Sequence, residues 1–177
     1  MSASHTLYLI RHPRPLIAPG VCYGRLDVAA EDPLPIAAAL RALLPTDAPV
    51  WSSPLQRCRL LAGHLHPQPR LDERLQEIDF GDWEGRAWDD IPRQEIDAWA
   101  ADLLHYTPPG GESPARLSAR VNAFLAELPP GAHIIVTHAG IIRTLHSRAS
   151  GQPLEQVLQQ PAAAYGSLTR MVLPPGD

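Results

Sequence analysis

Short apolar runs alternate along the chain with longer amphipathic segments, which predicts strands separated by helices. The runs that have the length and residue types of buried strands cover 7–10, 50–52, 133–137 and 168–173. The segments with helical spacing or helix-boundary residues cover 34–44, 55–65, 88–104, 113–128 and 141–150. Prolines mark several boundaries, since Pro45 stops the first helical segment and Pro54 is expected at the first helical position of the second. The clearest amphipathic pattern is that of 113–128, which Pro129, Pro130 and Gly131 end.

Two stretches show neither the spacing of an amphipathic helix nor the pattern of a strand, and they are predicted to be loops. Residues 13–33 are rich in proline and glycine, and residues 76–85 are polar and contain two glycines. Long loops of this kind in a compact domain are commonly functional. We therefore expect both loops to take part in a binding site.

The alternation of strands and helices along residues 1–177 predicts one α/β domain with a mostly parallel sheet covered by helices on both faces. In such folds, ligands bind beyond the carboxyl ends of the strands. Arg11 and His12 follow the first strand, Arg57 lies just after the second at the start of a helix, and His138 follows residues 133–137. We expect these four side chains to come together at one edge of the sheet.

Composition narrows the functional classes. The chain has 45% hydrophobic and 19% charged residues, and no apolar run is long enough to cross a bilayer, so we expect a cytoplasmic protein with no membrane partner. The net charge of −4 argues against nucleic acid as a partner. All 15 basic residues are arginines, and the absence of lysine excludes a Walker A loop and Schiff-base chemistry. A monomer or a homodimer is expected.

Cysteine and histidine spacing predicts neither a disulfide framework nor a metal site. Cys22 and Cys58 form no C-x-x-C motif and are expected to be reduced packing residues. His64 and His66 flank a helix end without carboxylate or cysteine partners at ligand spacing, so we interpret them as surface residues. No cofactor is predicted. Neither cysteine has an arginine six positions later, and no D-x-D pair or G-x-S-x-G elbow occurs, which leaves histidine as the candidate nucleophile for phosphate chemistry.

The grouped arginines and histidines are suited to a phosphate monoester. Such an ester is a dianion near neutral pH, and the guanidinium groups of Arg11 and Arg57 can hold it through charge-assisted hydrogen bonds. A neutral His12 imidazole can attack phosphorus, and the two arginines should lower the pKa of His12 and keep it neutral. His138 is placed to donate a hydrogen bond to the phosphate oxygens, and the neighbouring Ala139 is expected to contact the substrate.

The leaving alkoxide needs a proton, and the following attack by water needs a base. One carboxylic acid on a mobile loop can serve both steps. Glu77 is the best candidate, and Glu84 and Asp82 in the same loop compete with it. Trp83 and Tyr23 are interpreted as packing residues, although their rings could stack on a substrate.

Taken together, these residues resemble the histidine phosphatase superfamily, also called phosphoglycerate mutase-like, whose signature is an R-H-G triplet after the first strand. The similar blocks are residues 11–13, 52–62, 75–85, 110–113 and 136–143. The resemblance implies a three-layer α/β/α sandwich. It also implies a phosphate pocket formed by Arg11, His12, Arg57 and His138, with Glu77 as the proton donor.

Within that superfamily, residues 80–85 and 138–143 look most like the alpha-ribazole phosphatase and broad-specificity phosphatase branch, and residues 21–27 point the same way. The expected function is hydrolysis of a small phosphate monoester, with alpha-ribazole 5′-phosphate as one candidate substrate. A phosphomutase is disfavoured because Ala18 stands near the place where mutases usually carry asparagine. A non-catalytic phospho-ligand binding module is the other alternative, because Pro13 replaces the signature glycine and removes a backbone N–H. Arg14 is interpreted as a solvated surface arginine.

Overall fold

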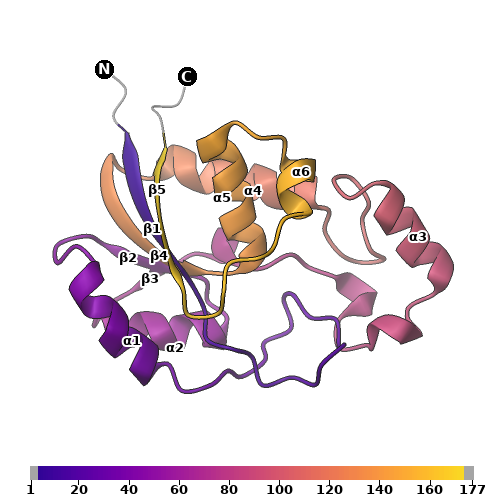
Figure 1. The fold of residues 1–177 in the computed structure, drawn as a ribbon, viewed down its shortest axis with the longest axis horizontal. Helices are drawn as coiled ribbons and strands as arrows, with labels where there is room; N and C mark the ends of the chain where they lie inside the picture. Colours follow the sequence, from indigo (N-terminus) through magenta and orange to yellow (C-terminus); the bar gives the residue numbers. More distant parts are fainter. Residues whose placement is uncertain (1–3, 174–177) are drawn as a thin grey trace.

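A five-stranded sheet in the order β3-β2-β4-β1-β5 forms the centre of the computed structural model, which describes residues 4–173 (Figure 1). The strands are β1 (His5–Arg11), β2 (Val50–Ser52), β3 (Arg70–Leu71), β4 (Gly131–Thr137) and β5 (Leu168–Leu173). The pairs β1–β4, β2–β4 and β2–β3 are parallel, and β5 runs antiparallel to β1. The mostly parallel sheet is confirmed. The sequence did not predict β3, since its two residues are too few to show a period.

Helices cover both faces of the sheet, with α1 and α2 on one side and α4 and α5 on the other (Figure 1). The helices are α1 (Leu34–Leu40), α2 (Gln56–Leu65), α3 (Arg93–Ala101), α4 (Pro114–Glu127), α5 (Ala139–Ser150) and α6 (Leu154–Leu158). In β1, Leu7 and Leu9 pack toward α4 and α5, whereas Ile10 packs toward α1 and α2. This strand alternation fills both hydrophobic layers, and the predicted three-layer α/β/α sandwich is confirmed.

The predicted helix boundaries need two corrections. Pro54 does not occupy the first helical position of α2, because Leu55 is the N-cap and the helix begins at Gln56. The single helix expected over 88–104 is divided into a 3₁₀ turn at Trp88–Asp90 and α3, which begins after Pro92. A proline nitrogen has no N–H to continue the helical hydrogen bonds, so the division occurs at Pro92. In addition, the predicted segment 34–44 ends as α1 followed by a 3₁₀ turn at Arg41–Leu43, and α6 was not predicted.

A satellite core of aromatic residues supports the lobe that carries α3. Trp83 is fully buried, and its Nε1 donates a hydrogen bond to Glu95 of α3 at 2.6 Å. The rings of Trp88 and Trp99 stack with centroids 5.6 Å apart. Trp83 is therefore a packing residue, as predicted. No residue of α3 itself is buried, so this helix is held chiefly by the aromatic cluster.

The two cysteines are buried free thiols, as the sequence predicted. Burial is the main cause that raises the pKa of Cys22 to about 12 and that raises the pKa of Cys58. Neither thiol is therefore a ready nucleophile near neutral pH. None of the helices within residues 4–173 is both long and apolar enough to cross a membrane.

The carboxyl ends of β1, β2 and β4 meet at one edge of the sheet. Arg11 pairs with Thr137 in the parallel register, and the backbone N–H of His12 donates to the Thr137 carbonyl at 3.1 Å. From the β2 side, the N–H of Ser53 donates to the Val136 carbonyl at 3.0 Å. These contacts bring together the residues that follow the three strands.

Candidate active site

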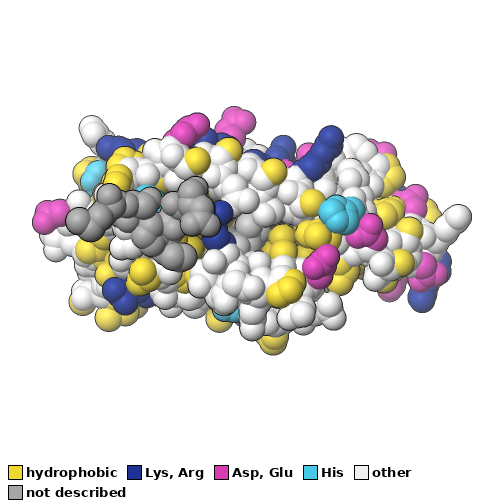
Figure 2. Space-filling view, turned by 90° about the horizontal axis from the view of Figure 1, so that it is seen from above, with side chains coloured by type: hydrophobic (Ala, Val, Ile, Leu, Met, Phe, Trp, Pro, Cys, Tyr) yellow, Lys and Arg dark blue, Asp and Glu magenta, His cyan; other side chains and the backbone are white. Residues whose placement is uncertain are grey.

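A cavity of about 350 Å³ opens at this edge of the sheet, between the ends of β1 and β4 and the α3 lobe. Seen from above, apolar side chains gather between the body of the molecule and that lobe (Figure 2). The residues that line the cavity form a polar group and an apolar group, which we call the polar end and the apolar end of the cavity. The polar end is lined by Arg11, His12, Glu77, Gly140 and Arg143. The apolar end is lined by Ile78, Phe80, Trp99, Leu103, Leu117 and Leu158.

His12 presents one free ring nitrogen to the polar end. Its Nδ1 lies 2.7 Å from the carbonyl oxygen of Pro13, which can only accept, so Nδ1 carries the proton and Nε2 keeps its lone pair. No other hydrogen bond to the His12 ring occurs among residues 4–173. Burial lowers the pKa of His12 to about 3, aided by the charges of Arg57 and Arg11 and opposed by the Pro13 hydrogen bond. The neutral form persists over the physiological range.

Arg11 lies beside His12 in the cavity wall. Its Nη1 donates to the Ala163 carbonyl at 2.5 Å, and the guanidinium lies over the ring of Tyr165 at 4.0 Å. The segment before β5 therefore holds the Arg11 side chain in place. A cation fixed in this way beside a neutral imidazole suits an anionic ligand.

Arg57 is 1% exposed and stands behind the wall of the cavity. Its Nη1 and Nη2 donate to the carbonyls of Leu26 and Gly24, at 2.8 and 2.5 Å. In this geometry both terminal nitrogens hold the loop 13–33, and the charge of Arg57 acts on His12 by lowering its pKa. The predicted direct contact between Arg57 and phosphate stays a prediction.

His138 is fully buried, and its ring centroid lies 5.1 Å from that of His12. Its Nε2 lies 2.8 Å from Oγ of Ser53 and 3.4 Å from Sγ of Cys58. Burial is the main cause that keeps the pKa of His138 well below its usual value. The structure thus places a second neutral imidazole behind the first, with Ser53, which the sequence analysis missed, as its hydrogen-bond partner.

Glu77 lies at the N-terminus of α5. Its two carboxylate oxygens are 3.2 and 3.1 Å from the backbone nitrogen of Gly140, and Oε1 also accepts from the N–H of Ile78 at 3.0 Å. The first turn of α5 and the backbone of Ile78 thus hold the Glu77 side chain in place. A Cβ at position 140 would collide with Oε1 of Glu77, so glycine at this position allows the carboxylate to approach the start of α5. Ala139, at the start of α5, also lines the cavity, and its contact with the substrate stays a prediction.

Glu84, the rival of Glu77, is fully engaged elsewhere. Its carboxylate accepts from the backbone N–H groups of Gly24, Arg25, Leu26 and Phe80 at 2.9 to 3.0 Å. These four bonds tie the loop 13–33 to the loop 76–85. Neither Glu84 nor the exposed Asp82 lines the cavity, so the geometry favours Glu77 as the carboxyl that faces His12.

Two cavity residues were not predicted to be functional. Arg143 lies three residues after Gly140, one helical turn along α5, and its Nη2 donates to the Gln160 carbonyl at 2.6 Å. That spacing could have identified it, since residues three apart share a helix face. Tyr23 also lines the cavity, and its hydroxyl lies 3.0 Å from that of Tyr165. Two tyrosines from opposite ends of the chain thus meet beside Arg11 and Arg57.

Across residues 4–173, no three histidine, cysteine, aspartate or glutamate side chains are gathered as a metal ion would require. His64 lies in the last turn of α2 and His66 is its C-cap, and both are only partly covered, away from the cavity. Arg14 has a side chain that is 66% exposed and a distant ion pair with Glu31, which agrees with its interpretation as a surface residue.

The residues of this site lie within a sequence that matches a known protein family over nearly its whole length. The sequence profile of the histidine phosphatase superfamily (branch 1) matches residues 7–177. This chain belongs to the histidine phosphatase superfamily. The similarity that the sequence blocks suggested is therefore confirmed at the level of the family.

Relatives of this chain carry both phosphatase and mutase names. It is 35% identical over 104 residues to the adenosylcobalamin/alpha-ribazole phosphatase of Escherichia coli K12, an alignment that covers 55% of this chain and 51% of that protein. The chain thus spans about half the length of this curated relative.

Among solved structures, a candidate alpha-ribazole-5′-P phosphatase from Escherichia coli K-12 is similar, with a TM-score of 0.83, 26% identity and coverage of 95% and 90% of the two chains. A phosphoglycerate mutase from Thermus thermophilus has a TM-score of 0.75 at 29% identity, covering 93% and 91%. The fold is therefore shared by both named activities.

Pro13 keeps the contact that orients the His12 ring. Proline lacks the N–H of the signature glycine, but it keeps the carbonyl oxygen that accepts from His12 Nδ1. Pro13 is itself buried, and its backbone has no positive φ. The substitution therefore leaves the orientation of the nucleophile candidate intact and removes one possible donor to an anion.

Proposed function

We propose that this protein hydrolyses a small phosphate monoester through a phosphohistidine formed on His12. The observation that carries the proposal is the orientation of the His12 ring. Pro13 fixes the proton on Nδ1, and Nε2 is free in a cavity that also holds Arg11 and Glu77. An unprotonated nitrogen beside a cation and opposite a carboxyl group is what two-step displacement at phosphorus requires.

In the first step, Nε2 of His12 attacks phosphorus and the bond from phosphorus to the ester oxygen breaks. The protonated carboxyl of Glu77 gives its proton to that oxygen, and the alcohol leaves. In the second step, the Glu77 carboxylate takes a proton from water, whose oxygen attacks phosphorus. The phosphorus–nitrogen bond breaks, which releases inorganic phosphate and restores both side chains. Arg11 holds the phosphate oxygens throughout, and Arg57 adds charge from behind the wall.

The apolar end of the cavity indicates the kind of alcohol that the ester carries. Phe80, Trp99, Leu103 and Leu158 offer contact area but no counter-charge. An alcohol with an aromatic or apolar group fits this lining, and alpha-ribazole 5′-phosphate, a ribose phosphate with an aromatic base, is such an ester. A phosphoglycerate carries a second anionic group, which these apolar residues cannot pair and for which Arg143 is the cation of the lining beside Arg11.

The test is a phosphate-release assay with 4-nitrophenyl phosphate, alpha-ribazole 5′-phosphate and 3-phosphoglycerate, each with and without a chelator. We expect release from the two aromatic esters in the presence of the chelator. A reaction quenched in alkali should retain phosphate on His12, and the His12→Ala variant serves as the control. Full activity of that variant, or label on another residue, would overturn the proposal.

Two other outcomes would identify the alternatives. Conversion of 3-phosphoglycerate to its isomer without release of phosphate would show a mutase. Absence of turnover with every ester, together with micromolar binding of inorganic phosphate, would show a phospho-ligand binding module.

A further inference from the structure

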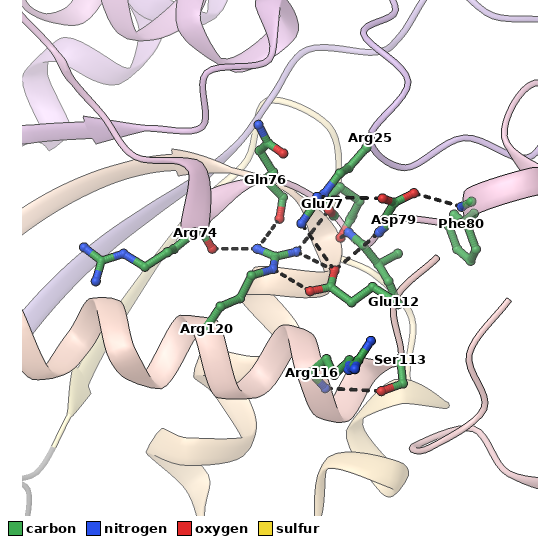
Figure 3. Close-up of polar contacts among 12 residues, drawn as sticks. Arg25, Arg74, Gln76, Glu77, Asp79, Phe80, Glu112, Ser113, Arg116 and Arg120 are labelled. Carbon is green, nitrogen blue, oxygen red and sulfur yellow. Dashed lines mark hydrogen bonds and ion pairs between the residues drawn. The ribbon is translucent and has the colours of Figure 1, made fainter. Parts of the chain in front are cut away.

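Arg120, on α4, directs its guanidinium into the loop that carries Glu77 (Figure 3), and it does not line the cavity. Its Nη1 donates to the carbonyls of Arg74 and Gln76 at 2.6 and 2.7 Å, and its Nη2 donates to the carbonyl of Glu77 at 3.1 Å. The remaining N–H groups, on Nε and Nη2, donate to the two carboxylate oxygens of Glu112 at 2.8 and 2.9 Å. All five N–H donors of the guanidinium are therefore used.

The chain from Arg74 to Glu77 depends on side chains for its carbonyl partners. The one carbonyl that Arg120 omits, that of Leu75, accepts from Oγ1 of Thr137 at 2.8 Å. Four consecutive carbonyls are thus held, three from α4 and one from the end of β4. The residue that follows Thr137 is His138, so the same strand end supports both the histidine pair and the loop that carries Glu77.

Glu112 pairs with the charge of Arg120 at this partly buried position. The side chains of Arg120 and Glu112 are only 15% and 12% exposed, so each charge needs its partner. Glu112 also accepts from the N–H of Asp79 at 3.4 Å, and Arg25 of the opposite loop lies 3.8 Å from it. A planar guanidinium can bond a carboxylate and three carbonyls at once, which the single ammonium of lysine cannot reproduce.

We infer that Arg120, oriented by Glu112, is a positioning residue that fixes the backbone on both sides of Glu77 and so aims its carboxyl at the ester oxygen. The carboxyl itself has only three backbone N–H contacts, to Gly140 twice and to Ile78. Without a fixed backbone, these contacts do not determine where the acidic proton lies. This inference rests on the proposed role of Glu77 as proton donor.

The experiment compares two esters that differ in their need for a proton. 4-Nitrophenyl phosphate releases a stable anion, so its leaving oxygen hardly needs a proton. An alkyl ester such as 2-phenylethyl phosphate would release an alkoxide, so its cleavage depends on the proton donor. We expect Arg120→Lys to lower kcat/KM for the alkyl ester by about 100-fold, the cost of a misplaced catalytic group. The comparison uses kcat/KM because it covers only the steps up to release of the alcohol, whereas kcat also includes the second step, in which Glu77 acts as base for both esters. The loss for 4-nitrophenyl phosphate should be much smaller.

Arg116→Lys is the matched control, because Arg116 lies one turn earlier on α4 and is exposed. Its backbone N–H donates to Ser113 (Figure 3), and its side chain makes no hydrogen bond within residues 4–173. We expect both of its rates to stay at the wild-type level. Thr137→Val removes the Leu75 contact without changing volume, and it provides a second test should Arg120→Lys fail to fold. Thr137→Val should also lower the rate for the alkyl ester more than the rate for 4-nitrophenyl phosphate, but by a smaller factor than Arg120→Lys.

Glu77→Gln separates the failure of this inference from the failure of the proposed function. If Glu77→Gln lowers kcat/KM selectively for the alkyl ester while Arg120→Lys and Thr137→Val lower kcat/KM equally for both esters, the positioning role is wrong. If Glu77→Gln lowers kcat/KM equally for both esters, the assignment of Glu77 as proton donor is wrong. A selective loss of activity on the alkyl ester in all three variants supports both the positioning role of Arg120 and the donor role of Glu77.

Discussion

The two ends of the cavity are built in different ways. The polar end stands on the central sheet, where His12 follows β1, and Gly140 follows β4 in the first turn of α5. The apolar end stands on peripheral elements, with Trp99 on α3 and Leu158 on α6. The polar end is therefore held by the hydrogen bonds of parallel strands, whereas Phe80 and Trp99 of the apolar end belong to the aromatic cluster. We expect changes at the first to abolish chemistry and changes at the second to alter the choice of ester.

The largest effect is expected from His12→Asn. Asparagine keeps a polar group of similar length but has no nucleophilic nitrogen, so the rate of phosphate release should fall by on the order of 10³ or more. Steady-state assays with 4-nitrophenyl phosphate measure this loss, and circular dichroism checks that the fold is kept. Retention of more than a tenth of the wild-type rate would be inconsistent with a role at the polar end.

The second largest effect is expected from Gly140→Ala, which should lower kcat on an alkyl phosphate by about 100-fold. A methyl group there would collide with Oε1 of Glu77, and the carboxyl would have to leave its place at the start of α5. Gly63→Ala in α2 is the control, since a Cβ at that position meets no atom within 4 Å. The control should keep full activity and gain up to about 1 kcal/mol of stability from better helix propensity. Equal losses in both variants would contradict the explanation.

The pH dependence of stability tests the burial of neutral imidazoles at the polar end. The pKa of His12 falls from 6.5 to about 3 on folding, so between these values the unfolded chain binds the proton and the folded protein does not. Stability should therefore decrease as pH falls from 6.5 toward 3, with a slope of about 1.4 kcal/mol per pH unit from this group. Urea unfolding at several pH values should show a shallower slope for His12→Asn. An unchanged slope would mean that His12 is protonated in the folded state.

The smallest effect is expected at the apolar end. Trp99→Ala removes aromatic contact area but no charge, so kcat/KM for an aromatic ester such as alpha-ribazole 5′-phosphate should fall about tenfold. The value for glycerol 3-phosphate, which is too small to use that contact, should hardly change. A parallel loss for both esters would show that Trp99 supports the fold of the lobe instead of contacting the alcohol.

Sequence reasoning succeeded where a residue's place follows from a strand end. His12, Arg57 and His138 each come just after a predicted strand, and parallel strands bring their carboxyl ends together. It could not decide between Glu77 and Glu84, which are seven residues apart in one polar loop. Only the structure shows that Glu84 accepts four backbone N–H groups while Glu77 faces the cavity.

The sequence by itself determined the layer architecture, the histidine and arginine pair that follows the first strand, and the family. These features depend on the local periodicity of hydrophobic residues and on short motifs, both of which involve residues close together in the sequence. Only the tertiary structure decided that Arg57 bonds loop carbonyls, that Ser53 faces His138, and that Arg120 holds the backbone of Glu77. Each of these contacts joins residues far apart in the sequence, and no local pattern records which side chain a loop carbonyl will meet once the helices pack on the sheet.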